Sequence, residues 1–137
     1  MTTINLTETE LFKSFAEMGT GESYVDLHNE FECDSINYSL KLSQLSLTFK
    51  ASKNNLRKIR HVEIIFKNVK IALMNFKVDN TPYNSCRAID MIYRGRFEDE
   101  NSELKESSDE GKYYYYIDFL DDYSFEIFSD YAIAELK

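Results

Sequence analysis

The stretch YYYYIDFLDDYSFEIF, residues 113–128, decides the fold expected for this chain. Its apolar residues alternate with polar ones on both sides of a pair of aspartates, as two half-buried β-strands joined by a turn require. Opposed residues of a hairpin share a face, which predicts two directly paired positions, Ile117 with Ile127 and Phe119 with Phe125. This register needs a connection with an odd number of residues, such as 121–123.

A second hairpin is expected earlier in the chain, because residues 45–49 and 62–66 also alternate between apolar and polar. A tight turn at residues 54–55, with both asparagines at positive φ, pairs Leu47 with Val62 and Leu45 with Ile64. The alternation changes parity at Lys67-Asn68, which predicts a bulge or a turn there. Two hairpins together favour an antiparallel sheet.

The remaining segments complete a mainly β prediction. Residues 69–78 are expected as a strand, residues 86–97 as a strand or a short helix, and residues 129–137 as a last strand or one helical turn. Thr7 and Glu10 form a capping box, which predicts a short amphipathic helix over residues 8–18. We therefore expect a single domain over residues 1–137, folded as an antiparallel β-sandwich or a partly open barrel with one short N-terminal helix.

The composition narrows the classes of function. With 43% hydrophobic residues, 137 residues can bury a sizeable core without a metal or disulfides. A net charge of -8 argues against nucleic acid as a partner. The first residues lack the basic and apolar regions of a signal peptide, there is no apolar run long enough to span a membrane, and Cys33 and Cys86 have no paired spacing, so a cytoplasmic protein with reduced thiols is expected.

The negative charge is concentrated near the carboxyl end. Residues 98–112 hold seven acidic residues and little to bury, which predicts a mobile acidic loop. Such a surface suits a basic protein partner. The expected partner-binding residues are acidic side chains and outward tyrosines: Glu98, Asp99, Glu100, Glu103, Asp109, Glu110, Tyr114, Tyr116, Asp121 and Asp122.

The tyrosine run leaves two interpretations open. If Tyr113 and Tyr115 face the core, Tyr114 and Tyr116 face away from it, where they pack under a second layer or anchor an interface. The alternative function is a small-molecule or carbohydrate binder, with a cavity lined by Tyr113, Tyr115 or Tyr93 at the mouth of a half-open barrel.

Enzyme chemistry has little support in the sequence, so the protein is expected to be non-enzymatic and to need no cofactor. A glycine-rich phosphate loop and a nucleophile elbow are both missing. Asp26, His28 and Glu30 would share one face of a strand and are the only metal candidates, although the prediction is that no metal binds. An enzyme would need a cleft with a polar cluster around His28 or His61.

Four short pieces of the chain carry a resemblance to a family: Leu27-His28-Asn29, Leu45-Ser46-Leu47-Thr48-Phe49, Ile64-Ile65-Phe66-Lys67-Asn68-Val69 and Tyr116-Ile117-Asp118-Phe119. Their order resembles small bacterial domains of uncharacterised function, some of them thought to be immunity proteins encoded beside secreted toxins. The resemblance implies a β domain that binds a toxin protein. It transfers no functional residue to this chain.

Overall fold

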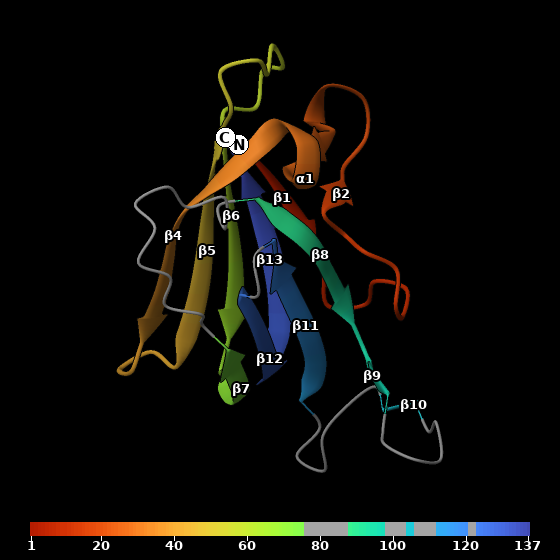
Figure 1. Cartoon of the computed structure of the whole chain (residues 1–137), viewed down its shortest axis with the longest axis vertical. Coiled ribbons are helices and arrows are strands. Elements are labelled where there is room, and N and C mark those ends of the chain that lie inside the picture. Colours follow the sequence, from red (N-terminus) through yellow and green to blue (C-terminus); the bar gives the residue numbers. More distant parts are fainter. Residues whose placement is uncertain (76–87, 98–103, 106–111, 121–122) are drawn as a thin grey trace.

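The structure, a computed structural model, describes residues 1–75, 88–97, 104–105, 112–120 and 123–137. Two antiparallel sheets form most of it (Figure 1). The five-stranded sheet has the order β1-β13-β6-β5-β4, with bounds β1 Thr2–Asn5, β13 Tyr131–Leu136, β6 His61–Lys67, β5 Gln44–Ala51 and β4 Phe31–Ser39. The four-stranded sheet has the order β7-β12-β11-β8, with bounds β7 Lys70–Asn75, β12 Tyr123–Ser129, β11 Tyr113–Phe119 and β8 Ile89–Arg94.

The other elements are short. Two pairs of two-residue strands lie outside the main sheets: β2 Glu17–Met18 with β3 Val25–Asp26, and β9 Arg96–Phe97 with β10 Leu104–Lys105. The helical elements among the described residues are a 3-10 turn, η1 Gly21–Ser23, and one α-helix, α1 Leu27–Glu30. The predicted mainly β, antiparallel class with one short N-terminal helix is confirmed, and the two sheets are not closed into a barrel.

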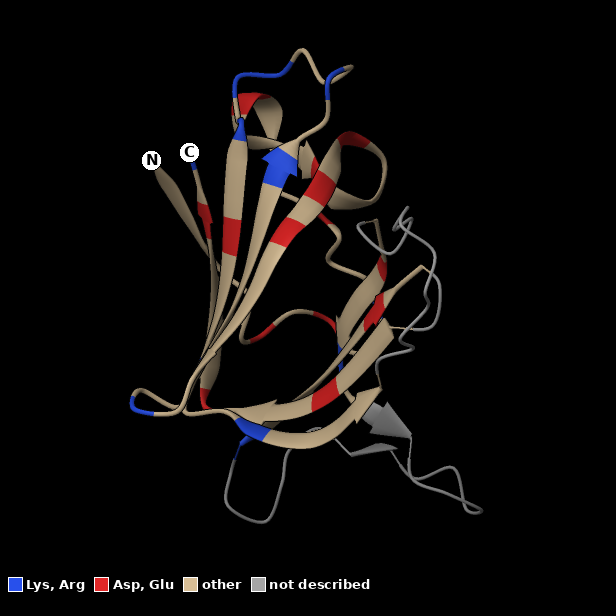
Figure 2. Cartoon of the chain, turned by 60° about the vertical axis from the view of Figure 1, so that its left-hand side comes forward, with Lys and Arg blue, Asp and Glu red and all other residues tan. Residues whose placement is uncertain are grey.

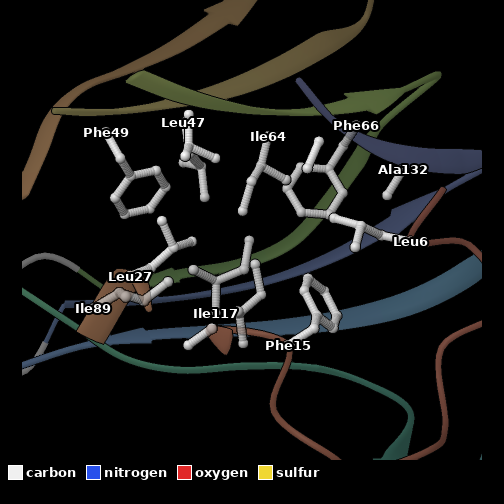
Figure 3. Packing of buried hydrophobic residues seen from close by; sticks show 14 of the residues in the cluster. Leu6, Phe15, Leu27, Leu47, Phe49, Ile64, Phe66, Ile89, Ile117 and Ala132 are labelled. Atoms are coloured by element: carbon white, nitrogen blue, oxygen red, sulfur yellow. The ribbon is translucent and has the colours of Figure 1, made fainter. Parts of the chain in front are cut away.

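The core lies between the two sheets and is filled by side chains that point inward at every second strand position. Figure 3 shows Leu47 and Phe49 of β5 and Ile64 and Phe66 of β6 opposite Ile117 of β11 and Ile89 of β8. All six of these side chains are fully buried. Leu6, Phe15 and Leu27 of the N-terminal segment also pack against this core, so the segment forms part of it.

The hairpin of residues 113–128 forms with the predicted faces but in a different register. Ile117 lies opposite Phe125, and Phe119 lies opposite Tyr123. Ile127 pairs with Tyr115, so the predicted pairs of Ile117 with Ile127 and Phe119 with Phe125 are wrong by two residues. A shift of two positions leaves every side chain on its own face, which is why the predicted burial holds despite the shift.

The second hairpin shows the same kind of shift. Leu47 pairs with Ile64 and Leu45 with Phe66, in place of the predicted partners two residues earlier. The turn at residues 54–55 is also wrong, because neither asparagine is among the residues with positive φ. Asn55 is buried, and its side chain amide donates a hydrogen bond of 3.1 Å to the Glu30 carbonyl oxygen. A longer loop between β5 and β6 therefore packs against the end of α1.

Two strands change sheets at a shared corner. β6 passes into β7 where Asn68 adopts a φ of 52°, which confirms the predicted break in alternation, and β12 passes into β13 at Asp130. The fully buried Ser129 hydroxyl lies 2.8 Å from the Lys67 carbonyl oxygen. The Asn68 amide donates to the Asp130 carboxylate at 2.7 Å, and the Lys112 ammonium lies 3.3 Å from the other carboxylate oxygen. These polar contacts hold the two crossing strands together.

The corner predicts a pH dependence of stability. The Asn68 amide, which donates to the Asp130 carboxylate, and the nearby Lys112 ammonium lower the pKa of that carboxyl, although its partial burial opposes them. Because the pKa of Asp130 is lower in the folded chain than in the unfolded chain, the ionised carboxylate stabilises the fold at a pH above the unfolded pKa of about 3.9. This stabilisation is lost as the pH falls through the folded pKa. In urea titrations from pH 6 to pH 2, we expect the unfolding free energy of Asp130→Asn to fall less steeply than that of the wild type. Parallel curves would contradict this role.

The helix predicted over residues 8–18 is wrong. The Thr7 hydroxyl, expected to cap it, donates to the Ala132 carbonyl oxygen at 3.3 Å and accepts from the Ala132 amide at 3.1 Å. The short helix of the chain is α1 instead, where the Asp26 carboxylate accepts from the Asn29 amide at 3.0 Å. Contacts with β13 therefore replace the local cap that the sequence pattern suggests.

The N-terminal segment instead runs along the edge of β8. The Phe12 amide donates to the Arg94 carbonyl oxygen at 2.9 Å, and the Phe15 amide donates to the Ile92 carbonyl oxygen at 2.8 Å. Phe12 has a φ of 62°, a conformation that a helix cannot contain. The edge of the four-stranded sheet is thereby covered on this side.

The open alternatives for the chain end are decided as well. Residues 129–137, expected as a strand or a helical turn, form β13 between β1 and β6. The described part of residues 69–78 forms β7, and that of residues 86–97 forms β8 and β9.

Among the described residues, there is no helix long and apolar enough to cross a membrane.

Candidate functional site

The outer face of the four-stranded sheet combines aromatic and acidic side chains. Leu73, Glu126, Tyr116 and Tyr93 lie side by side in one row across all four strands, since Glu126 pairs with Leu73 and Tyr116, and Tyr116 pairs with Tyr93. The next outward row includes Asp118 opposite Met91. We call this group of six residues the tyrosine face.

A β-bulge in β8 creates this arrangement. Phe119 pairs with Ile89 and Asp118 pairs with Met91, so Asp90 is an extra residue on its strand. Ile89 points into the core, whereas Met91 and Tyr93 point outward with Asp118 and Tyr116. An uninterrupted alternation would place Ile89, Met91 and Tyr93 on one side. The bulge therefore delivers Tyr93 to the side of the sheet where Tyr116 lies.

The two rings are stacked. The centroids of Tyr93 and Tyr116 lie 5.1 Å apart with an interplanar angle of 28°, and Phe12 lies 5.8 Å from Tyr93 on the side of the sheet edge. Gly95 makes room for this approach, because a Cβ atom there would lie 3.1 Å from the Phe12 ring. The aromatic group is thus held by the bulge, by the edge pairing of residues 11–15 and by stacking.

The tyrosine face has a negative electrostatic environment. Burial raises the pKa of Tyr93, and the Glu126 and Asp118 carboxylates raise it further. Burial also raises the pKa of Tyr116, followed by Asp118, Tyr93 and Glu126, while a hydrogen bond with Ser124 acts in the opposite direction. Both carboxylates therefore act on both phenols, and the site favours a positively charged group.

Only part of the predicted binding surface falls on this face. Tyr116 lies on it and is half-buried. Tyr114 also points outward, but it is 2% exposed and packs edge-on against Phe128 with ring centroids 5.3 Å apart. Tyr114 is therefore packed, which is one of the two arrangements that the sequence left open for it. The other predicted residues lie outside the described part of the chain: Glu98, Asp99, Glu100, Glu103, Asp109, Glu110, Asp121 and Asp122.

The sequence pattern did not predict Asp118 and Glu126 as members of the tyrosine face, or Phe12 as its neighbour. Asp118 and Glu126 alternate with buried residues, so their outward direction is visible in the period-two pattern of β11 and β12. Their position next to Tyr93 is not visible there, because it depends on strand order and on the bulge. Phe12 is missed because residues 8–18 are not helical.

The metal candidates have separate partners. Asp26 accepts from Asn29, His28 Nδ1 lies 2.6 Å from the Ile89 carbonyl oxygen, and Glu30 pairs with Arg57 at 2.8 Å. His28 and Glu30 belong to α1, so the strand that would align the three side chains is wrong. Among the described residues, no group of three or more His, Cys, Asp or Glu side chains is arranged to hold a metal ion.

His28 does lie at a pocket. Its volume is about 220 Å³, and its lining includes Asp26, Glu17, Asp90 and Ser14. The contact of Nδ1 with a carbonyl oxygen assigns the proton to Nδ1 and leaves Nε2 as an acceptor when the ring is neutral. The Ser14 hydroxyl oxygen accepts from the Ile92 amide at 3.3 Å, which engages it with backbone. The pocket therefore places the His28 imidazole near carboxylates. Its described lining residues include no activated nucleophile.

Of the tyrosines expected to line a ligand cavity, Tyr115 packs inside the core. Tyr115 is fully buried, with its ring 5.1 Å from Phe66 and 6.3 Å from Phe15. A second pocket of about 260 Å³ is lined by residues of the N-terminal segment, from Ile4 to Met18. Neither pocket is lined by Tyr93, Tyr113 or Tyr115.

Two basic residues of the loop between β5 and β6 form ion pairs within the chain. Figure 2 shows Lys and Arg on this loop, close to acidic residues of the N-terminal segment. Lys58 lies 3.0 Å from Glu22, and Arg57 lies 2.8 Å from Glu30. The loop therefore has acidic partners in its own molecule.

Comparison with known proteins identified no matching family model, no similar curated protein and no similar solved structure.

Proposed function

We propose that this chain is a non-enzymatic, protein-binding domain of the immunity type, which covers a basic surface of its partner with the tyrosine face and the acidic residues between 98 and 112. The observation that carries the proposal is the pair of stacked tyrosines, Tyr93 and Tyr116, with the Glu126 carboxylate across the strand from Tyr116 and the Asp118 carboxylate in the next row. Tyrosines supply large contact area at an interface, and carboxylates steer a basic partner toward it.

Two apolar side chains belong to this face. Leu73 is 50% exposed and Met91 is 37% exposed on the two outer strands. Interfaces combine such apolar contact area with a polar surround, and methionine and tyrosine are both enriched in them. The face therefore suits a partner surface that is basic and partly apolar.

The experiment measures association with the protein that co-purifies from the native host or is encoded by the neighbouring gene. We expect the rate of association to fall steeply as salt increases, and the double variant Asp118→Asn with Glu126→Gln to lower it roughly fivefold at low salt. The rate constants are measured by surface plasmon resonance with purified partner.

The matched control removes the same charge from the other sheet. Glu63 and Glu135 pair with each other on the outer face of the five-stranded sheet, so Glu63→Gln with Glu135→Gln changes the net charge equally. We expect this control to keep most of the wild-type rate. A partner that binds equally well to both double variants, or the failure of both sources to yield a binding partner, would overturn the proposal.

A further inference from the structure

Arginine is held in this chain by a tyrosine ring together with a carboxylate. The Arg57 guanidinium carbon lies 4.8 Å from the centroid of the Tyr24 ring, while its Nε donates to the Glu30 carboxylate at 2.8 Å. A second arginine, Arg94, lies 5.4 Å from the centroid of Tyr113. The Tyr24 site shows the chemistry directly: the ring supports the flat face of the guanidinium and the carboxylate binds its edge.

The tyrosine face offers the same two groups. Glu126 lies directly across the strand from Tyr116 on one side, and Tyr93 lies across from it on the other. Tyr93 stacks on Tyr116 from β8, and Glu126 lies on the other neighbouring strand, so Glu126 is on the side of Tyr116 away from Tyr93. Leu73, beyond Glu126 in the same row, is half-exposed and provides apolar surface for an aliphatic stem.

The charges differ between the two places. At Tyr24, burial raises the pKa of the phenol and the Glu17 and Asp26 carboxylates raise it further, but Arg57 acts in the opposite direction. At Tyr93, the charged groups that shift the pKa are Glu126 and Asp118, and both raise it. The tyrosine face thus presents the ring and carboxylates of an arginine site with a negative potential that a guanidinium would neutralise.

We propose that the tyrosine face recognises an arginine side chain of the partner, with the guanidinium laid on Tyr116 and hydrogen-bonded to Glu126; this rests on the proposed function and adds the identity of the recognised group. Arginine fits better than lysine for two reasons. Its planar, weakly hydrated guanidinium stacks on a ring, and its fork of donors matches a carboxylate. A lysine ammonium gains the charge attraction but lacks the planar contact.

The test uses two fluorescein-labelled peptides of equal length and charge, one with three arginines and one with three lysines among glycine and serine. Binding to the full chain is measured by fluorescence anisotropy at low salt. One exposed stacking contact corresponds to a preference of about two- to fivefold. We therefore expect the arginine peptide to bind wild type tighter than the lysine peptide by that factor.

Variants separate stacking from charge. Tyr116→Leu keeps the charge, and we expect it to bring the ratio of the two affinities close to one, whereas Tyr116→Phe keeps the ring and the preference. Tyr131→Leu is the matched control, because Tyr131 is 43% exposed on the outer face of the five-stranded sheet, and it should leave the ratio unchanged. Urea titration of each variant confirms that the fold is retained.

The outcomes distinguish this inference from the proposed function. Equal binding of both peptides, weakened by Glu126→Gln, would overturn the arginine preference and leave a charge-guided protein-binding face in place. Binding that is indifferent to Glu126→Gln and Asp118→Asn, or no binding of either peptide, would overturn both.

Discussion

Replacing Ile117 by alanine is expected to lower the free energy of unfolding by about 2–5 kcal/mol. Ile117 is fully buried and lies between Phe125 and Ile92, both also fully buried, on the inner face of the four-stranded sheet. The substitution removes apolar contact area and leaves a cavity between two sheets that can close only partly. The measurement is urea-induced unfolding followed by circular dichroism at neutral pH.

The control for this prediction is Leu56→Ala. Leu56 is 96% exposed in the loop between β5 and β6, so the same kind of truncation should change the unfolding free energy by less than about 0.5 kcal/mol. Equal effects of the two substitutions would mean that Ile117 does not lie in the core, and the packing of the two sheets described above would be wrong.

Replacing Gly19 by alanine is expected to destabilise the fold by about 2–4 kcal/mol. Gly19 has a φ of 80°, and a Cβ atom there would lie 2.1 Å from the Ser23 carbonyl oxygen. The clashing atom belongs to the backbone, so a change of rotamer cannot relieve it. The chain between β2 and β3 would have to move, and with it the buried Met18 and Val25.

Gly21 provides the matched control two residues later. Its φ is 58°, but a Cβ atom there would meet nothing within 4 Å. Gly21→Ala therefore has only the conformational cost of a left-handed residue, about 1–2 kcal/mol. The difference between the two variants in thermal and urea unfolding isolates the steric contribution. If Gly19→Ala were no worse than Gly21→Ala, the tight turn at Gly19 would be refuted.

The strands and their inner faces were predictable because alternation is a local property. Ile117, Phe119, Phe125 and Ile127 are all buried, as the pattern indicates, and so are Leu45, Leu47, Phe49, Val62, Ile64 and Phe66. In each strand, every second side chain points toward the core, whichever strands lie beside it. The sequence therefore predicts both hairpins and the antiparallel class.

Register was not predictable from the same pattern. Both hairpins are shifted by two residues from the expected pairing, and a shift of two keeps every side chain on its face. The alternation is therefore equally compatible with both registers. In the second hairpin the register depends on a loop whose Asn55 bonds to the Glu30 carbonyl oxygen, 25 residues away in sequence. Such a contact exists only in the folded chain.

The N-terminal segment was mispredicted for a related reason. The capping box and apolar spacing of residues 8–18 satisfy the local rules for a helix, but an exposed edge of β8 offers hydrogen-bond partners to the same backbone. Phe15 also gains burial against Tyr115, at a ring distance of 6.3 Å. Helices this short draw most of their stability from packing, so the sheet edge decided the conformation.

By itself, the sequence determined the β class, the inward residues of each hairpin, the break at Asn68 and the outward direction of Tyr116, because all four follow from period-two patterning and local turn chemistry. Only the tertiary structure decided the registers, the path of residues 8–18 and the composition of the tyrosine face. That face joins Tyr93, Tyr116 and Glu126 from three strands, and it exists because strand order and one extra residue in β8 bring them into one row.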